Sequence, residues 1–171
     1  MKDKFLVACF AQKGRELTGN SPKIAAMAIE TLRKKGIDAD QFTITPVETY
    51  PDDHNEFEAV VKAELSAHSR PEIIGKYSGM KYIRKIVLVV PNWHAALPPA
   101  VTTFLDKYDF NDKSLIPIVC HDGDGGKEIE GELRKLLPKT CIKPVVEIKS
   151  DEITSASSKV EKAIDELLCT Q

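Results

Sequence analysis

The chain reads KIVLVVPNWHAALPP from Lys85 to Pro99, where an apolar run passes directly into a loop that holds the only tryptophan. The run KIVLVV has the length of a β-strand and is rich in β-branched residues, a pattern typical of a strand buried on both faces of a parallel sheet. In open α/β sheets, ligands bind beyond the carboxyl ends of the strands. This stretch therefore predicts a central parallel strand followed by a candidate binding loop.

Other apolar runs of the same character lie on both sides of this stretch. They are FLVACFA (Phe5 to Ala11), SLIPIVC (Ser114 to Cys120) and IKPVVEI (Ile142 to Ile148), with a weaker alternating run, DADQFTI (Asp38 to Ile44), that suits an edge strand. We therefore expect five strands, four of them well buried.

Amphipathic helical patterns separate these runs. The first opens with Ser21 as predicted N-cap and Pro22 at the first helical position, and ends at Gly36. Further apolar stripes follow Asp53 and cover Ile129 to Leu137 and Val160 to Leu168, whereas residues 66–82 are expected to form a loop. Strands alternating with helices predict right-handed crossovers and one doubly wound α/β domain over residues 1–171.

The composition excludes several classes of protein. Of the 171 residues, 42% are hydrophobic and 29% charged, and the net charge is −2, so neither a disordered chain nor a nucleic-acid or membrane-surface binder is indicated. The apolar run before Cys9 is too short for a signal segment. The four cysteines form no C-x-x-C pair, and we expect reduced thiols in a cytoplasmic protein.

Three loops after strand ends carry candidate chemistry. Thr18-Gly19-Asn20-Ser21 leads into the first helix, where backbone N–H groups and the helix dipole favour a phosphate, although simple capping explains such a string equally well. In the loop after the central strand, Trp93 could stack on a planar ring or fold into the core. The glycines of His121 to Gly131 let the backbone approach a ligand or form only a solvated turn.

Two histidines of these loops are candidate proton donors. Histidine as a residue type exchanges protons near neutral pH, so His94 and His121 could deliver protons to a ligand, although they could equally be loop residues without a role. A metal site built from His94, His121, Asp122 and Asp124 has suitable ligand types, but no paired motif supports it, and we expect no metal.

With these loops in view, the chain resembles the flavodoxins, specifically the short-chain flavodoxin-like proteins of bacteria. The resemblance runs from about Phe5 to Leu137. It is densest in PVETYPDDHNE (Pro46 to Glu56), SRPEI (Ser69 to Ile73) and VPNWHAALPPAVTTFLDKYDFNDKSLIP (Val90 to Pro117).

The resemblance implies a flavodoxin-like five-stranded parallel sheet of order 2-1-3-4-5 that binds FMN non-covalently between strands one and three. Trp93 would stack on the flavin, and backbone groups around His94 and Ala95 would bond near its N5 atom. The implied cofactor-binding residues are Thr18, Gly19, Asn20, Ser21, Pro91, Asn92, Trp93, His94, Ala95, Cys120, His121, Asp122, Gly123, Asp124 and Gly125.

The implied function is electron transfer, or reduction of a small acceptor, through bound FMN. The partner would be an electron donor or acceptor protein or a small molecule, and the oligomeric state stays open, a homodimer included. The alternative is a flavodoxin-like domain that has lost FMN and serves as a binding or structural module.

Departures from the family pattern favour this alternative. Lys13 to Leu17 look like an insertion in the phosphate loop, and Glu16 stands where a hydroxyl is expected and would repel a phosphate. The family often has Trp-Trp-Gly where this chain has Trp93, His94 and Ala95. In the third loop, Asp122 and Asp124 add negative charge.

Overall fold

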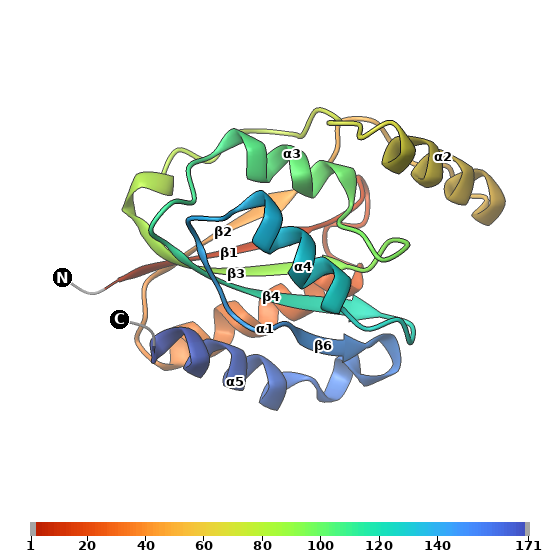
Figure 1. Cartoon of the computed structure of the whole chain (residues 1–171). Helices are drawn as coiled ribbons and strands as arrows, with labels where there is room; N and C mark the ends of the chain where they lie inside the picture. Colours follow the sequence, from red (N-terminus) through yellow and green to blue (C-terminus); the bar gives the residue numbers. More distant parts are fainter. Residues whose placement is uncertain (1–2, 170–171) are drawn as a thin grey trace.

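The computed structural model describes residues 3–169, which form a parallel sheet between helices (Figure 1). The strands are β1 (Lys4–Phe10), β2 (Ala39–Ile44), β3 (Ile83–Pro91), β4 (Ser114–His121), β5 (Cys141–Ile142) and β6 (Val146–Lys149). The helices are α1 (Asn20–Lys34), α2 (His54–Ser66), α3 (Pro99–Lys107), α4 (Lys127–Leu136) and α5 (Ser157–Leu168), with 3-10 turns at Met80–Tyr82 and Ser150–Ser155.

The strand order is β2-β1-β3-β4-β5, and every pairing is parallel. This order confirms the predicted flavodoxin-like doubly wound fold. The sequential order of the strands reverses at the pair of β1 and β3, where Val7 lies opposite Val87. This point of the sheet is where doubly wound domains place their ligands.

The fifth strand differs from the prediction, because it is split into β5 and β6. Both segments pair with β4. Pro144 in the gap has no N–H to donate to a strand, and the N–H of Val145 donates instead to the Glu130 carboxylate at 2.7 Å. The expected single strand from Ile142 to Ile148 is therefore wrong in its middle three residues.

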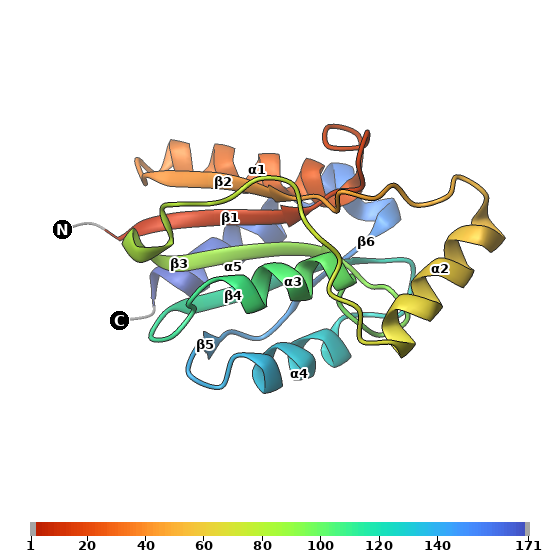
Figure 2. The same ribbon diagram turned by 90° about the horizontal axis from the view of Figure 1, so that it is seen from above.

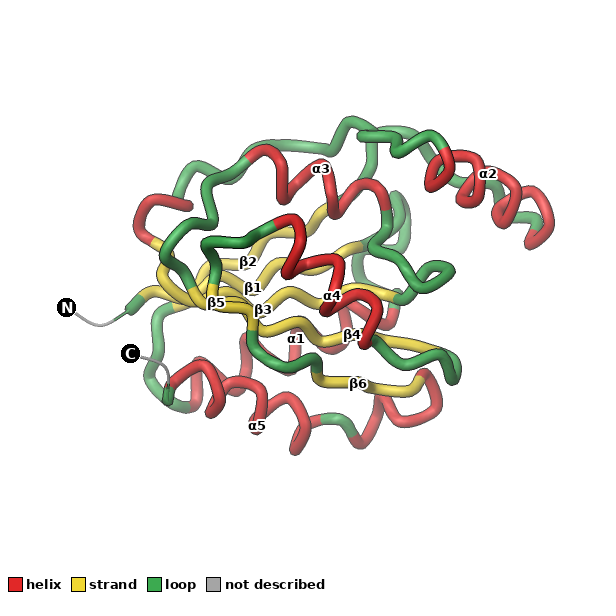
Figure 3. Tube along the Cα trace, viewed as in Figure 1, coloured by secondary structure: helices red, strands yellow, loops and turns green. Residues whose placement is uncertain are grey.

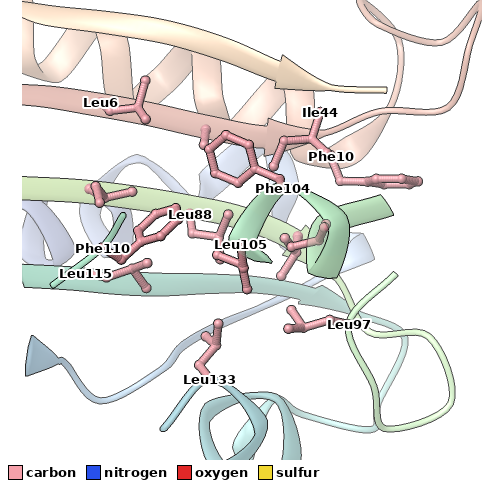
Figure 4. Close-up of a cluster of buried hydrophobic side chains, with 14 of the residues drawn as sticks. Leu6, Phe10, Ile44, Leu88, Leu97, Phe104, Leu105, Phe110, Leu115 and Leu133 are labelled. Atoms are coloured by element: carbon pink, nitrogen blue, oxygen red, sulfur yellow. The ribbon is translucent and has the colours of Figure 1, made fainter. Parts of the chain in front are cut away.

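Two hydrophobic cores form because successive residues of a strand point to opposite faces. Leu6, Ala8 and Phe10 belong to the core under α3 and α4, and Phe5, Val7 and Cys9 belong to the core over α1 and α5. Figure 2 shows the two helical layers from above, and Figure 3 shows the same layers by type of element. In Figure 4, Leu88, Phe104 and Leu133 fill the space between the sheet and α3 and α4.

Helix α1 confirms one predicted boundary and corrects the other. Gly36 has a left-handed φ of 70°, and the N–H of Ile37 bonds back to Leu32, so the helix ends as predicted. At its start, however, the N-cap is Gly19, and Ser21 lies buried within the first turn. The prediction of Ser21 as N-cap is wrong.

Helix α2 is placed differently from the other helices. It begins after Asp53, whose carboxylate accepts the N–H of Glu56 at 3.0 Å, which confirms the predicted start. The helix then stands beyond the carboxyl ends of the strands instead of packing on the sheet (Figures 1 and 2). Residues 67–79, here called the return segment, run back past α3 toward β3, and the backbone N–H of Tyr77 donates to the Tyr108 hydroxyl at 2.7 Å.

Within residues 3–169, no helix combines the length and the apolar character needed to cross a membrane.

Candidate functional site

A cavity of about 680 Å³ lies at the carboxyl ends of β1, β3 and β4. The loops that follow these three strands and the face of α2 enclose it. Its lining residues are Phe10, Ala11, Gln12, Arg15, Thr18, Gly19, Asn20, Ser21, Pro22, His54, Phe57, Glu58, Val61, Pro91, Asn92, Trp93, His94, Cys120, His121, Asp122, Asp124 and Ser150.

The structure brings together nearly all residues of the three predicted loops. Only Ala95, Gly123 and Gly125 among the predicted site residues do not line this cavity. Each of these three nevertheless bonds through its backbone N–H to a side chain that does line it.

The first loop delivers the amino terminus of α1 to the cavity. The first turn of a helix leaves N–H groups without intrahelical acceptors, and here the groups of Asn20 and Ser21 stand at the cavity wall, with no acidic residue in that turn. A side chain at Gly19 would meet Pro22 Cδ at 3.2 Å and the carbonyl oxygen of Arg15 at 3.3 Å, so the turn favours glycine.

The insertion before this loop does not place a carboxylate in the cavity. Glu16 is exposed and does not line it, whereas Arg15 does. The guanidinium of Arg15 lies 3.8 Å from the exposed carboxylate of Asp52. The expected repulsion between Glu16 and a phosphate therefore has no basis in the geometry of this loop.

The second loop holds Trp93 within an aromatic cluster of Phe10, Tyr50, Phe57 and Trp93. The indole meets each of the other three rings edge to face, with centroid distances of 5.0 to 5.2 Å. Such pairs stabilise a structure beyond the area that they bury. Trp93 is half-buried and packs at the margin of the core while it lines the cavity, so it is not a fully buried core residue, and its stacking on a planar ring stays a prediction.

A tight turn follows Trp93. His94 and Ala95 both have left-handed φ values, 56° and 62°, and the backbone groups of Trp93 and Ala96 bond to each other in both directions at 3.1 Å. Left-handed conformations are costly for residues with a Cβ. The N–H of Ala95 donates to Asn92 Oδ1 at 2.8 Å, so this group is engaged within the protein and is not free to bond near N5 of a flavin.

The third loop is organised by His121, the last residue of β4. Its Nδ1 accepts the N–H groups of Gly123 and Gly125 at 3.0 and 3.1 Å, which leaves the ring hydrogen on Nε2. The side chain of Asn92 donates to the carbonyl oxygen of Gly125 at 2.8 Å and so joins the second loop to the third. Asp122 lies at the exposed mouth of the cavity.

Cys120 is the buried group beneath these loops. Burial raises the pKa of the Cys120 thiol to about 11, and the hydroxyl of Ser21 lies 3.8 Å from its sulfur. The thiol therefore stays protonated at neutral pH and is a poor nucleophile. In the described part of the chain, no group of three or more His, Cys, Asp or Glu side chains is arranged to hold a metal ion.

The sequence interpretation missed the contribution of α2. His54, Phe57, Glu58 and Val61 line the cavity, and His94 Nε2 lies 2.6 Å from Glu58 Oε2. The spacing of these four positions marks one face of a helix, and it was visible in the sequence. Nothing in the sequence, however, showed that this face turns to the cavity instead of the sheet.

An open parallel sheet of this order, with three loops around a cavity at its switch point, defines a nucleotide-binding doubly wound domain. The model of the flavodoxin family matches residues 4–167, and the chain belongs to that family. No curated protein matches the chain.

Several solved structures share the fold. A proposed flavoprotein from Bacteroides eggerthii has a TM-score of 0.80 at 18% identity. The alignment covers 100% of that chain and 99% of this one. A second, from Bacteroides uniformis, has a TM-score of 0.78 at 22% identity, with 99% and 96% covered. A flavoprotein from Lactobacillus acidophilus, solved in complex with FMN, has a TM-score of 0.66 at 16% identity, with 99% and 91% covered.

Proposed function

We propose that this protein is an FMN-binding flavoprotein that passes electrons between a donor and an acceptor. The observation that carries the proposal is the cavity at the switch point between β1 and β3, bounded on one side by the amino terminus of α1. Membership of the flavodoxin family and the FMN complex of the Lactobacillus acidophilus relative support FMN as the cofactor.

The residues present fit such a cofactor. The N–H groups of Asn20 and Ser21 at the start of α1 offer positive charge for a terminal phosphate, and Arg15 lines the same cavity. Trp93 offers an aromatic wall for a planar ring system, and the third loop offers backbone groups for its polar edge. The bound flavin would supply the electron-transfer chemistry, and the protein supplies binding, orientation and electrostatics.

Two cavity histidines differ in their ability to deliver protons. His121 is buried at the end of β4 and keeps its ring hydrogen on Nε2, with Nδ1 held by two backbone groups. His94 is more exposed and already bonded to Glu58. His121 can therefore donate a hydrogen bond from Nε2, but with Nδ1 held by two N–H groups it does not form the imidazolium that a proton transfer needs, so we favour His94 as the proton donor. The four free cysteines accord with a cytoplasmic location.

The test is the cofactor content of the purified protein. We expect a yellow solution with flavin absorption bands, and we expect FMN to quench the emission of Trp93 when it is added to the apoprotein, since the chain has no other tryptophan. A colourless protein that neither binds FMN nor changes its emission would contradict the proposal. That result would favour the alternative, a flavodoxin-like binding module without a cofactor.

A further inference from the structure

Asn92 lines the cavity, yet both ends of its side-chain amide bond within the protein. The Oδ1 atom accepts the N–H of Ala95 at 2.8 Å, and the Nδ2 atom donates to the carbonyl oxygen of Gly125 at 2.8 Å. The backbone N–H of Asn92 donates to the carbonyl oxygen of Cys120 at 3.0 Å. One side-chain bond needs an acceptor and the other needs a donor, and an amide supplies both.

The first of these side-chain bonds holds a turn that is costly to form. His94 and Ala95 have left-handed φ values of 56° and 62°, a conformation that a Cβ disfavours and that glycine adopts freely. The backbone bonds between Trp93 and Ala96 close the turn. The bond to Asn92 Oδ1 adds to them at Ala95, one of the two left-handed residues, and so offsets part of the cost.

The second side-chain bond reaches the third loop, which has bonds of its own. His121 Nδ1 accepts the N–H groups of Gly123 and Gly125, and the carboxylate of Glu147 accepts the N–H of Gly126 at 3.1 Å. The bond from Asn92 Nδ2 to Gly125 ties this loop to the second one.

The first loop is anchored in another way. Helix α1, which starts there, buries Ile24, Ala28 and Leu32 in the core over α5. The bonds of Asn92 go to the second and third loops. A change at Asn92 therefore acts on the loops around a bound ring and leaves the anchoring of α1 in place.

We propose that Asn92 is a positioning residue that holds the turn of residues 93–96 and the third loop together as one unit, which receives the ring of the cofactor. The proposal rests on the proposed function, because the ring is that of FMN. The resemblance to the flavodoxins implies that Asn92 binds the cofactor itself. The bonds of its amide assign it instead a role that acts through the two loops.

Titration of the apoprotein with FMN and riboflavin separates the ring from the phosphate, because riboflavin has the same ring and no phosphate. We expect Asn92→Ala to weaken the binding of both ligands about tenfold, which corresponds to 1.4 kcal/mol. The ratio of the two affinities should stay as in the wild type. Asn111→Ala is the matched control, since Asn111 is exposed, does not line the cavity and precedes β4, at the far end of that strand from His121.

A second substitution, Ala95→Gly, tests the bond that holds the turn. Glycine adopts the left-handed conformation freely, so the turn should persist without the acceptor on Asn92. In the Ala95→Gly background, Asn92→Ala should therefore weaken riboflavin binding only about threefold, and a double-mutant cycle measures the difference.

Asn92→Asp tests the bond between the loops. A carboxylate keeps an acceptor for the N–H of Ala95 but has no hydrogen to donate to Gly125. We expect riboflavin binding to weaken, and Ala95→Gly should not restore it. Riboflavin is the ligand for this variant because it carries no phosphate that the new charge could repel. Asn92→Asp also serves where the alanine variant does not fold.

Amide hydrogen exchange in the apoprotein tests the link between the loops without a ligand. The N–H groups of Gly123 and Gly125 bond to His121 and not to Asn92. Their exchange should nevertheless rise roughly threefold or more in Asn92→Ala, because the loop opens more readily once its tie is lost. Asn111→Ala should leave it unchanged.

Unchanged exchange at Gly123 and Gly125 in Asn92→Ala would overturn the proposal. So would a loss of affinity for FMN alone, since Asn92 would then serve the phosphate. Equal losses from Asn92→Ala with alanine and with glycine at residue 95 would overturn it as well, since the turn would not depend on the bond. If neither ligand binds to the wild type, the proposed function fails, and the exchange rates still decide whether Asn92 joins the loops.

Discussion

Helices α1 and α2 follow neighbouring strands and both line the cavity, yet they are held by different forces. Helix α1 buries Ile24, Ala28 and Leu32 completely against the sheet and α5. Helix α2 buries only Val61 and is otherwise held by ring contacts and two polar bonds. The end of the cavity at the start of α1, here called the phosphate end, is therefore anchored by a helix that packs in the core, whereas the α2 wall depends on a few surface contacts.

The difference arises from how the chain covers the sheet. Beside β2, the place of a covering helix is taken by the return segment, which Tyr77 ties to β2 through a 2.8 Å bond from its hydroxyl to Asp40. Because that segment already covers the edge of the sheet, α2 is free to stand at the cavity. Rigid elements that hold a cofactor and weakly held elements that admit a substrate are a common division in binding sites.

The largest expected effect compares one leucine from the last turns of each helix. Replacing Leu32, which is fully buried, by alanine should lower the free energy of unfolding by about 2–5 kcal/mol. Replacing Leu65 of α2, which is half-buried, should cost about 1 kcal/mol or less. Urea unfolding measures both values. Equal losses would show that α2 is as well packed as α1.

The second prediction concerns the phosphate end. FMN should bind more tightly than FAD, and riboflavin most weakly, by about 1.5–3 kcal/mol relative to FMN, because a charged group gains bonds at the start of α1. Calorimetric titration of the apoprotein with the three ligands measures the series. Equal affinity for FMN and riboflavin would show that residues 18–21 do not grip phosphate.

Arg15 sharpens this test. Arg15→Ala should weaken FMN binding and leave riboflavin binding unchanged, whereas Lys13→Ala, on the exposed part of the same loop, should change neither. A parallel loss for both ligands in Arg15→Ala would mean that the side chain supports the loop and not the phosphate.

The third prediction concerns Trp93, which lines the cavity and contacts Phe57 of α2. Trp93→Ala should weaken FMN binding by about 0.5–1.5 kcal/mol beyond the lost area if the indole stacks on the flavin. Trp93→Phe keeps an aromatic ring and should restore most of the affinity. Unchanged FMN affinity in Trp93→Ala would leave the indole only its role as the anchor of Phe57, which it meets at 5.2 Å.

The smallest expected effect is on the motion of α2. Glu58→Gln weakens the bond to His94, and because both side chains are partly exposed the stability should fall by less than about 1 kcal/mol. Amide hydrogen exchange in residues 54–66 should rise roughly two- to fivefold, as about 0.5–1 kcal/mol requires. Lys62→Gln is the control. Exchange that stays at the wild-type rate would show that the aromatic cluster alone fixes the helix.

The sequence was a good guide where local chemistry determines the structure. Apolar runs predicted the strands, and the resemblance to the flavodoxins implied their order. Gly36 predicted the end of α1 because few other residues adopt its conformation. Pro144 could have predicted the break in the fifth strand. The position of α2 could not be predicted, because its apolar stripe fits a sheet and a cavity wall equally well. The side on which Glu16 lies likewise depends on the path of the inserted loop.

The split of the fifth strand has a consequence for how the molecule behaves at high concentration. An exposed edge strand with a long row of unpaired backbone groups is a template on which another chain can add a strand, and repeated addition leads to aggregates. Here the edge beyond β4 consists of two residues in β5 and four in β6, separated by a proline that cannot donate. On this side of the sheet, a neighbouring chain therefore finds no long row of unpaired backbone groups on which to add a strand.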